Sequence, residues 1–247
     1  MCTIVLAWQE FERTPVAVAA NRDESPDRPS SPPQTVDGEP RILMPRDERA
    51  GGTWMGVNEH RLFAIVANRW NDAALDAERS RGLLVADVLS AKTVVAAESV
   101  LETALAEHEY DGFSLLVASP SAAKLFLWDG EFASRSLDPG VHVIVNVGFD
   151  GTYDVPESRR AIGDRQTETA DRLQDRLQTD HGESSEEWLD RAGTALGDHD
   201  VGACIHHERY QTVSSSLVAI GAEGAVDWRY ADGPPCTAAF RPVDGQI

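Results

Sequence analysis

The N-terminal sequence MCTIVLAW, residues 1–8, places a cysteine at position 2 directly before a nearly continuous apolar run. Thr3 to Trp8 predicts a buried strand that starts directly after the cysteine. If Met1 is removed, Cys2 carries both a thiol and a free α-amino group, so that it can act as nucleophile and base at once. An α-amino group has a pKa of roughly 7.7–8.0 and can accept a proton near neutral pH. The stretch therefore predicts either an N-terminal nucleophile fixed by its strand or an ordinary first strand with an exposed end.

Length and composition predict a single domain over residues 1–247. The chain has 247 residues, 42% of them hydrophobic, which is enough to bury one large core. No apolar run reaches the roughly 18 residues of a membrane-spanning helix, and the first residues lack the basic region and the cleavage site of a signal peptide. We therefore expect a cytoplasmic protein that does not insert into membranes.

The charge of the chain is strongly negative, at −19, with a pI near 4.6. Nucleic acids and anionic membrane surfaces are recognised by clustered basic residues, so neither is an expected partner. Lysine is rare, with Lys92 and Lys124 standing beside many arginines. An acidic, lysine-poor surface is typical of proteins from a very salty cytoplasm, where screening over about 3 Å at 1 M salt weakens self-repulsion. We expect a halophilic source, such as a halophilic archaeon.

The cysteines indicate no metal site and no disulfide framework. Cys2, Cys204 and Cys236 are few and scattered, and no CxxC pattern occurs. Cys204, His206 and His207 are candidate ligands, but solvent-facing polar residues near a strand are the favoured interpretation. We expect neither a metal nor a cofactor.

Short apolar runs bounded by turn residues predict strands, and helical periodicity predicts helices between them. After the first strand, the predicted strands are 16–20, 62–67, 113–118, 141–145 and 216–220. A hairpin is predicted from 124–128 to 131–135 through Asp129-Gly130, a pair that favours a type I′ turn. The predicted helices are two within 81–108, one over 157–178 with Ile162, Thr169, Leu173 and Leu177 at helical spacing, and one over 184–196.

The stretch Ser25–Pro40 is rich in proline and polar residues and predicts a long loop. The order of the other elements is strands, then helices, then strands again. This order favours an α+β fold in which two sheets lie face to face with helices outside.

The segment Asn21-Arg22-Asp23-Glu24 directly follows the second predicted strand. Antiparallel pairing with the first strand would bring it back towards Cys2. In that position Arg22 can lower the pKa of the thiol and hold a substrate carbonyl or carboxylate, and Asp23 can orient the terminal amine. The alternative is a charged turn on a solvated surface.

The segment GGTWMGVN, residues 51–58, contains glycines that allow the backbone to approach another backbone or a ligand closely. It lacks the GxxxxGK[ST] pattern of a phosphate loop. Asn68 and Asn146 each follow an apolar strand, where an asparagine amide can donate to an oxyanion or close a turn. Trp54 and Trp70 are predicted to flank the candidate pocket.

Together these motifs resemble the NRDE-motif family, also called the transport and Golgi organisation 2 family. The resemblance rests on the MC start, on the NRDE segment at 21–24 with Arg28-Pro29, and on GGTWMG at 51–56. Further matches are SRG at 80–82, YDGF at 110–113 and SSS at 214–216, so the likeness covers almost the whole chain.

That family is similar in turn to N-terminal nucleophile hydrolases of the choloylglycine and penicillin V acylase type. The resemblance implies a four-layer αββα sandwich of two mainly antiparallel sheets and cleavage of non-peptide amide bonds. It also implies that Cys2 attacks, that Arg22 and Asp23 assist, and that Asn68 and Asn146 support the oxyanion. Asn21, Trp54 and Trp70 are then the expected substrate-binding residues.

The chain departs from the family pattern near its last long strand. Val213 stands where family members usually have an arginine, so the late arginine that assists the nucleophile in related acylases has no counterpart here. Val145 likewise stands where a serine usually precedes the asparagine.

Two functions follow from these motifs. The first is hydrolysis of an amide or related acyl bond in a small-molecule acyl substrate through an acyl-enzyme on Cys2. The alternative is a non-enzymatic carrier or trafficking protein that binds haem or lipid on the same fold.

Overall fold

The computed structural model describes residues 2–73, 75–245 and 247, which form two sheets in two separate units of the chain. The first unit comprises residues up to 27 together with 70–72 and 138–243, and the second comprises 28–69, 73–137 and 244–247. No helix among the described residues has the length and the apolar character needed to span a membrane.

The sheet of the first unit is antiparallel throughout, in the strand order β12-β11-β10-β1-β2-β14-β15-β16, with β13 paired to β14. Its strands are β1 (Thr3–Phe11), β2 (Thr14–Glu24), β10 (Gly140–Val145), β11 (Gly148–Phe149), β12 (Thr152–Tyr153), β13 (His206–His207), β14 (Tyr210–Ile220), β15 (Val226–Ala231) and β16 (Arg241–Pro242). The first strand of the chain is therefore central in its sheet, between β10 and β2.

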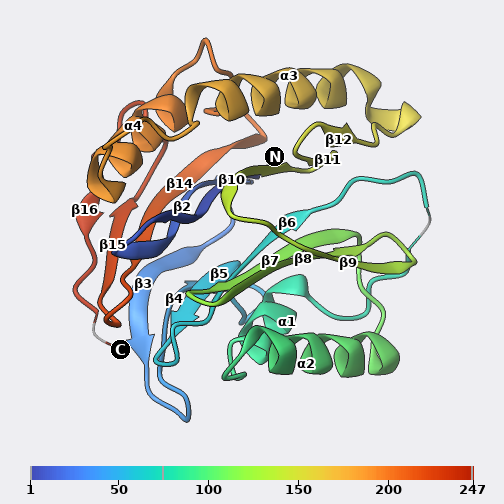
Figure 1. The fold of residues 1–247 in the computed structure, drawn as a ribbon. Helices are drawn as coiled ribbons and strands as arrows, with labels where there is room; N and C mark the ends of the chain where they lie inside the picture. Colours follow the sequence, from blue (N-terminus) through green and yellow to red (C-terminus); the bar gives the residue numbers. More distant parts are fainter. Residues whose placement is uncertain (1, 74, 246) are drawn as a thin grey trace. The chain divides into compact units, whose positions relative to one another are not determined.

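Two helices, α3 (Arg160–Arg176) and α4 (Ser185–Gly197), lie along one face of this sheet (Figure 1). Alternate residues of the central strands, such as Val5 and Ala19, enter the core between sheet and helices, as the two-residue period of a strand requires. Trp188 of α4 is fully buried there and donates its indole N–H to the carbonyl of Leu177, 2.8 Å away. The two helices therefore pack on this face of the sheet through the core. The opposite face of the sheet is lined by the other set of alternate side chains.

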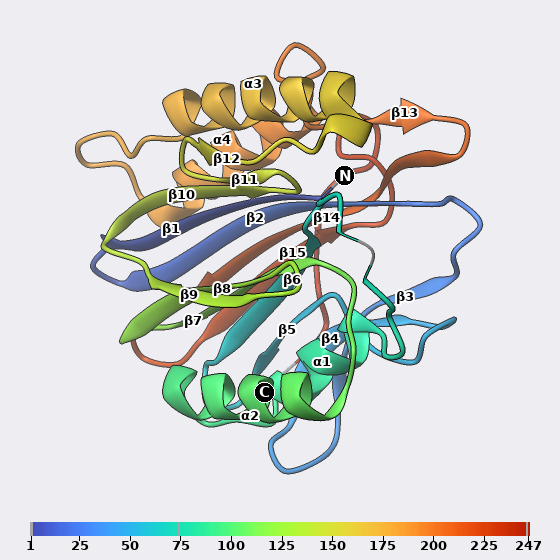
Figure 2. The same cartoon turned by 90° about the vertical axis from the view of Figure 1, so that its right-hand side faces the viewer.

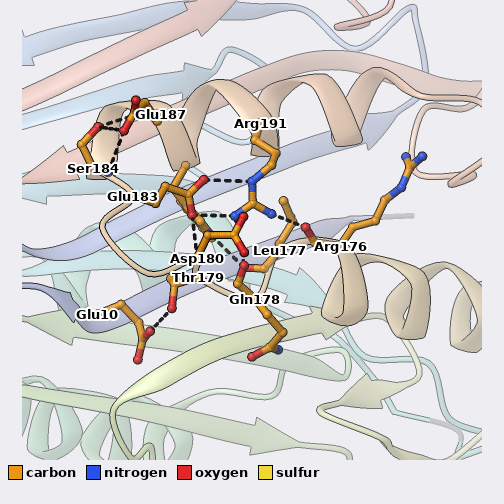
Figure 3. A network of polar contacts seen from close by, with 11 residues as sticks. Glu10, Arg176, Leu177, Gln178, Thr179, Asp180, Glu183, Ser184, Glu187 and Arg191 are labelled. Carbon is orange, nitrogen blue, oxygen red and sulfur yellow. Dashed lines mark hydrogen bonds and ion pairs between the residues drawn. The ribbon is translucent and has the colours of Figure 1, made fainter.

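Arg191 of α4 links α4 to the C-terminal end of α3 through hydrogen bonds (Figure 3). Its guanidinium donates to the carbonyl oxygens of Arg176 and Gln178, where α3 ends, and pairs with Glu183 at 2.6 Å. A cation at a helix C-terminus satisfies carbonyls that have no partner within the helix. Ser184 and Glu187 form a capping box at the start of α4.

The sheet of the second unit is also antiparallel, in the order β3-β4-β5-β6-β7-β8-β9, and carries α1 and α2 (Figure 2). Its strands are β3 (Ser30–Val36), β4 (Ile42–Asp47), β5 (Met55–Asn58), β6 (Phe63–Asn68), β7 (Phe113–Ser119), β8 (Ala122–Trp128) and β9 (Phe132–Ser136), and its helices are α1 (Arg81–Val88) and α2 (Val94–Glu107). Buried residues of α1, α2, β6 and β7 form its core.

Gly52 of the GGTWMG segment and Gly82 of the SRG segment contact each other through their backbones. A Cβ atom on Gly52 would lie 2.2 Å from the carbonyl carbon of Gly82, so the two backbones touch where only glycine fits at position 52. The N–H of Thr53 donates to the oxygen of Gly82 at 3.0 Å and fixes this contact. The glycines therefore join the GGTW segment to the start of α1, and the predicted close approach is one of backbone to backbone.

The predicted strands and helices are confirmed, with three local corrections. The loop predicted over Ser25–Pro40 was wrong, because Ser30–Val36 forms β3; this is an edge strand with a register shift between Ser31 and Gln34, so its prolines interrupt no inner ladder. The hairpin of β8 and β9 exists, but Trp128 pairs with Phe132, and only Gly130 of the intervening residues has a positive φ, at 105°. The turn is therefore not type I′. Ile162 is 43% exposed and does not belong to the buried face of α3.

Candidate active site

The ends of three strands meet around Cys2. Thr3 of β1 pairs with Asn21 of β2, which brings Arg22 beside Cys2. On the other side of β2, Arg22 pairs with Ser214 and Asp23 pairs with Thr212 of β14. The predicted return of the NRDE segment to the N-terminal cysteine is therefore confirmed by the strand register. Arg22 and Asp23 are 7% and 3% exposed, so the segment is not a solvated turn.

Cys2 is half-buried as a residue, while its thiol is desolvated. Burial raises the pKa of the Cys2 thiol, and the nearby charge of Asp23 raises it further. A hydrogen bond from the backbone N–H of Asp23 and the positive charge of Arg22 act in the opposite direction and favour the thiolate. The thiol consequently needs a base to remove its proton at neutral pH.

Asn146 holds the backbone nitrogen of Cys2. This asparagine directly follows β10 and is 1% exposed. Its Oδ1 accepts a hydrogen bond from the nitrogen of Cys2 at 3.0 Å and another from Nε2 of Gln166 at 2.8 Å. Gln166 lies on α3 and is fully buried, so it orients the asparagine amide from the helix side. Sequence reasoning missed Gln166, because no motif marks a lone glutamine on a helix.

Trp70 lies in the same unit and is linked to Asn146 through the backbone. Its N–H donates to the carbonyl oxygen of Asn146 at 2.9 Å. The guanidinium carbon of Arg159 lies 4.7 Å from the centre of a Trp70 ring, which is a cation–π contact. Trp70 and Asn146, which were predicted as site residues from separate segments, therefore lie next to one another.

Thr212 orients the carboxylate of Asp23. The threonine hydroxyl donates to Asp23 Oδ1 at 2.6 Å and accepts from the N–H of Ile205 at 2.9 Å. Burial raises the pKa of Asp23 to about 6, although the hydrogen bond from Thr212 works against that rise. Asp23 is therefore a carboxyl group that changes its charge close to neutral pH.

A β-bulge between Thr212 and Ser214 places Val213 at the register shift opposite Arg22 and Asp23. The irregularity lies where β14 passes the candidate site, and the correspondence of Val213 to a family arginine stays a prediction. The side chain there is half-buried and carries no charge.

Ser214 pairs with Arg22 across the sheet, and Tyr230 experiences the charge of that arginine. Tyr230 of β15 is 7% exposed, and burial raises the pKa of its hydroxyl. A hydrogen bond with Ser214 and the positive charge of Arg22 oppose that rise, so Ser214 contacts Tyr230 and the charge of Arg22 acts on the same hydroxyl. Tyr230 was missed from sequence, because a tyrosine in a strand is far more often a core residue.

Asn21 anchors β2 to the segment that follows α4. Its amide nitrogen donates to the carbonyl oxygens of Leu196 and Ala203, both at 3.0 Å. Within the described part of the chain its Oδ1 accepts no hydrogen bond. The substrate-binding role of Asn21 stays a prediction.

Asn68 and Trp54 belong to the second unit. Asn68 ends β6 and pairs with Phe113 of β7, and the carbonyl oxygen of Trp54 accepts the N–H of Val66 at 2.9 Å. Trp54 packs against the core of that unit. Their roles in oxyanion and substrate binding also stay predictions.

Comparison with known sequences identifies relatives along most of the chain. The sequence model of the family described as Transport and Golgi organisation 2 matches residues 1–229. The Transport and Golgi organization protein 2 homolog of Bos taurus is 32% identical over 162 residues, which cover 59% of this chain and 57% of that protein. The Homo sapiens homolog is 33% identical over 135 residues, 50% of this chain and 47% of the relative. The match spans about half the length of these relatives.

Solved structures share the fold. An N-acylethanolamine-hydrolyzing acid amidase ortholog from Caenorhabditis elegans superposes with a TM-score of 0.54 and 13% identity, over 87% of this chain and 92% of that one. A variant of the conjugated bile acid hydrolase from Clostridium perfringens gives a TM-score of 0.54 at 9% identity, over 99% of this chain and 92% of that one. At such low identity the likeness shows the fold alone.

Together with the two antiparallel sheets, these structural matches confirm the predicted α+β fold class. Because the family model covers residues 1–229, this chain belongs to the Transport and Golgi organisation 2 family.

Proposed function

We propose that this protein is an N-terminal cysteine hydrolase that cleaves an amide or related acyl bond of a small molecule through an acyl-enzyme. The observation that carries the proposal is the hydrogen bond from the nitrogen of Cys2 to Asn146 Oδ1, made beside the buried Arg22 and Asp23. Removal of Met1 turns that nitrogen into a free α-amino group next to the thiol of the same residue.

In the first half-reaction the α-amine takes the thiol proton, and the sulfur electron pair attacks the substrate carbonyl carbon. A C–S bond forms, and the carbonyl π electrons move to oxygen. When the tetrahedral intermediate collapses, the C–N bond breaks, and the amine leaves with the proton from the α-ammonium group. In the second half-reaction water attacks the thioester, its proton passes to the α-amine, and Cys2 regains its thiol as the carboxylic acid departs.

Each neighbour has a separate role in this scheme. Asn146, oriented by Gln166, fixes the α-nitrogen, and Asp23, oriented by Thr212, supplies negative charge that stabilises the α-ammonium form. Arg22 stabilises the thiolate and attracts the carbonyl or carboxylate of the substrate. Asn68 is proposed from the family resemblance as the oxyanion donor.

The solved relatives of the same fold support this choice. They are an ortholog of an N-acylethanolamine-hydrolyzing acid amidase and a conjugated bile acid hydrolase. The bile acid hydrolase is also solved as a mutant with its second residue changed from cysteine to alanine, with a TM-score of 0.51 to this chain. A cysteine at the same position is the nucleophile of the proposal.

A substrate panel tests the proposal. Acyl amides, lactones and thioesters are assayed with the wild type, with Cys2→Ala, and with a form that carries extra residues before Cys2. We expect turnover only by the wild type, because the alanine variant lacks the thiol and the extended form lacks the free α-amine. Circular dichroism establishes that all three are folded. Equal turnover by Cys2→Ala would refute the proposal, and equal turnover by the extended form would remove the α-amine from it.

A further inference from the structure

Four potential metal ligands from three stretches of the first unit lie close together. They are His199 after α4, Cys204 before β13, His206 in β13 and Cys236 after β15. Their ligand atoms all lie within 4.8 Å of one another. This His199–Cys204–His206–Cys236 cluster includes two side chains that sequence analysis assigned to the solvent-facing surface, and His207 is not part of it.

Four of the distances within the cluster are close to those between the corners of a zinc-centred tetrahedron. Zinc bonds of about 2.3 Å to sulfur and about 2.0–2.1 Å to nitrogen, at tetrahedral angles, separate two sulfurs by about 3.8 Å, two nitrogens by about 3.3–3.4 Å, and sulfur from nitrogen by about 3.5–3.6 Å. The two sulfurs are 3.6 Å apart, and the Nε2 atoms of the histidines are 3.3 Å apart. His206 Nε2 lies 3.5 Å from Cys204 Sγ and 3.2 Å from Cys236 Sγ.

The donor set selects the metal. Two thiolates and two imidazoles in a tetrahedral arrangement are typical of structural zinc, whereas calcium and magnesium prefer oxygen ligands. We propose that His199, Cys204, His206 and Cys236 bind one structural Zn²⁺ ion. The ligand spacing explains why sequence analysis rejected the site: Cys204 and His206 are two residues apart, but Cys236 follows only after the whole β14–β15 hairpin.

The segment that the cluster holds is the one that orients Asp23. Ile205 lies between two of the ligands; its N–H donates to the Thr212 hydroxyl at 2.9 Å, and its carbonyl oxygen accepts the N–H of Thr212, also at 2.9 Å. The Thr212 hydroxyl in turn donates to Asp23 at 2.6 Å. On the other side of Cys204, the carbonyl oxygen of Ala203 accepts the amide of Asn21. The zinc ion therefore stabilises the loop that positions Asn21 and Asp23. The importance of this loop for catalysis rests on the proposed function.

Metal content tests the site directly. Untagged protein, purified under reducing conditions from cells supplied with zinc, is analysed by inductively coupled plasma mass spectrometry. We expect about one zinc ion per chain in the wild type and in His207→Ala, the neighbour outside the cluster, and at least a tenfold loss in Cys236→Ser. If Cys236→Ser does not fold, His199→Ala, at an exposed ligand, gives the same comparison.

Cobalt(II) provides a readout of geometry. Replacing zinc with cobalt should give the intense visible bands of tetrahedral cobalt and the near-ultraviolet charge transfer of cobalt–thiolate bonds, and both should disappear in Cys236→Ser. Wild type that binds neither metal, zinc content that is unchanged by Cys236→Ser, or protein isolated with a Cys204–Cys236 disulfide and no zinc would overturn the site.

Removal of the metal separates this inference from the proposed hydrolase. Chelation should raise amide hydrogen exchange in residues 203–212 and lower hydrolysis, and added zinc should restore both. Zinc bound at one ion per chain in a protein without hydrolase activity would leave the metal site intact and refute only the proposed function. Unchanged exchange in residues 203–212 after metal loss would refute the positioning role.

Discussion

Asn146 Oδ1 lies 3.0 Å from the backbone nitrogen of Cys2, although 144 residues separate them in the chain. Because β1 pairs with β10, the end of β10 lies at the start of β1, and the asparagine meets the nucleophile there. The helix layer takes part as well, since Gln166 of α3 donates to the same oxygen at 2.8 Å. One side-chain amide thus connects the N-terminus, the sheet and a helix.

Loss of this amide should slow catalysis more than it weakens substrate binding. Asn146→Ala leaves the nitrogen of Cys2 without its acceptor, and loss of a buried hydrogen bond costs about 1–3 kcal/mol. We expect kcat to fall about 10- to 100-fold with little change in KM, and a smaller fall in Gln166→Ala. Gln174→Ala is the control, because Gln174 also lies on α3 and donates to β10, at the carbonyl of Val141. A kcat for Asn146→Ala equal to that of the control would contradict the assigned role.

Asp23→Asn should raise stability and lower activity, with a defined pH dependence. Burial raises the pKa of Asp23 to about 6, so the native state retains this proton over a pH range in which the unfolded chain has lost it. The protonated Asp23 therefore contributes fully to wild-type stability below about pH 4, and this contribution is lost as the pH rises through about 6. We expect the free energy of unfolding of Asp23→Asn, relative to wild type, to increase by about 2–3 kcal/mol between these limits. Urea titrations from pH 4 to pH 7 measure it, and a difference independent of pH would contradict the raised pKa.

The first strands were predictable because their signal is local. An uninterrupted apolar run such as Thr3 to Trp8 identifies a buried strand without knowledge of its neighbours. β3 was missed because prolines signal loops, yet an edge strand tolerates them where a register shift removes the need for a donor. Composition alone does not tell an inner strand from an edge strand.

The candidate site was predictable only in part, since its motifs are local and its partners are not. Cys2, Arg22 and Asp23 belong to one hairpin, so antiparallel pairing was sufficient to bring them together. Thr212, Gln166 and Tyr230 reach the site from distant elements and carry no motif of their own. The His199–Cys204–His206–Cys236 cluster was missed for the same reason, because its last ligand depends on the register of β14 and β15.

Gly52→Ala should destabilise the protein far more than Gly51→Ala. The new methyl group at position 52 would overlap the backbone of Gly82, and such overpacking costs about 3 kcal/mol or more. At Gly51 nothing lies within 4 Å, and the φ of 78° alone costs about 1 kcal/mol for alanine. The free energies of unfolding of the two variants and the wild type, from urea titration, provide the comparison. Equal losses would show that the contact between the two glycines is not tight.

Salt should stabilise the protein. With 41 acidic residues against 22 lysines and arginines, the folded chain carries a net charge of −19 and repels itself. The screening length falls from about 10 Å at 0.1 M salt to about 3 Å at 1 M, so the melting temperature should rise steadily over this range. Parallel melts in NaCl and KCl separate screening from a cation-specific effect. Full stability in dilute buffer would count against adaptation to high salt.

The central claim is that Cys2, once it is the first residue, forms the acyl-enzyme. Intact-mass analysis of the purified protein incubated with a β-lactone, followed by peptide mapping, tests this most directly. We expect a mass lacking Met1, a single acyl adduct on the Cys2 thiol, and no adduct in Cys2→Ala. Retention of Met1 in an active protein, or an adduct that persists in Cys2→Ala, would contradict it.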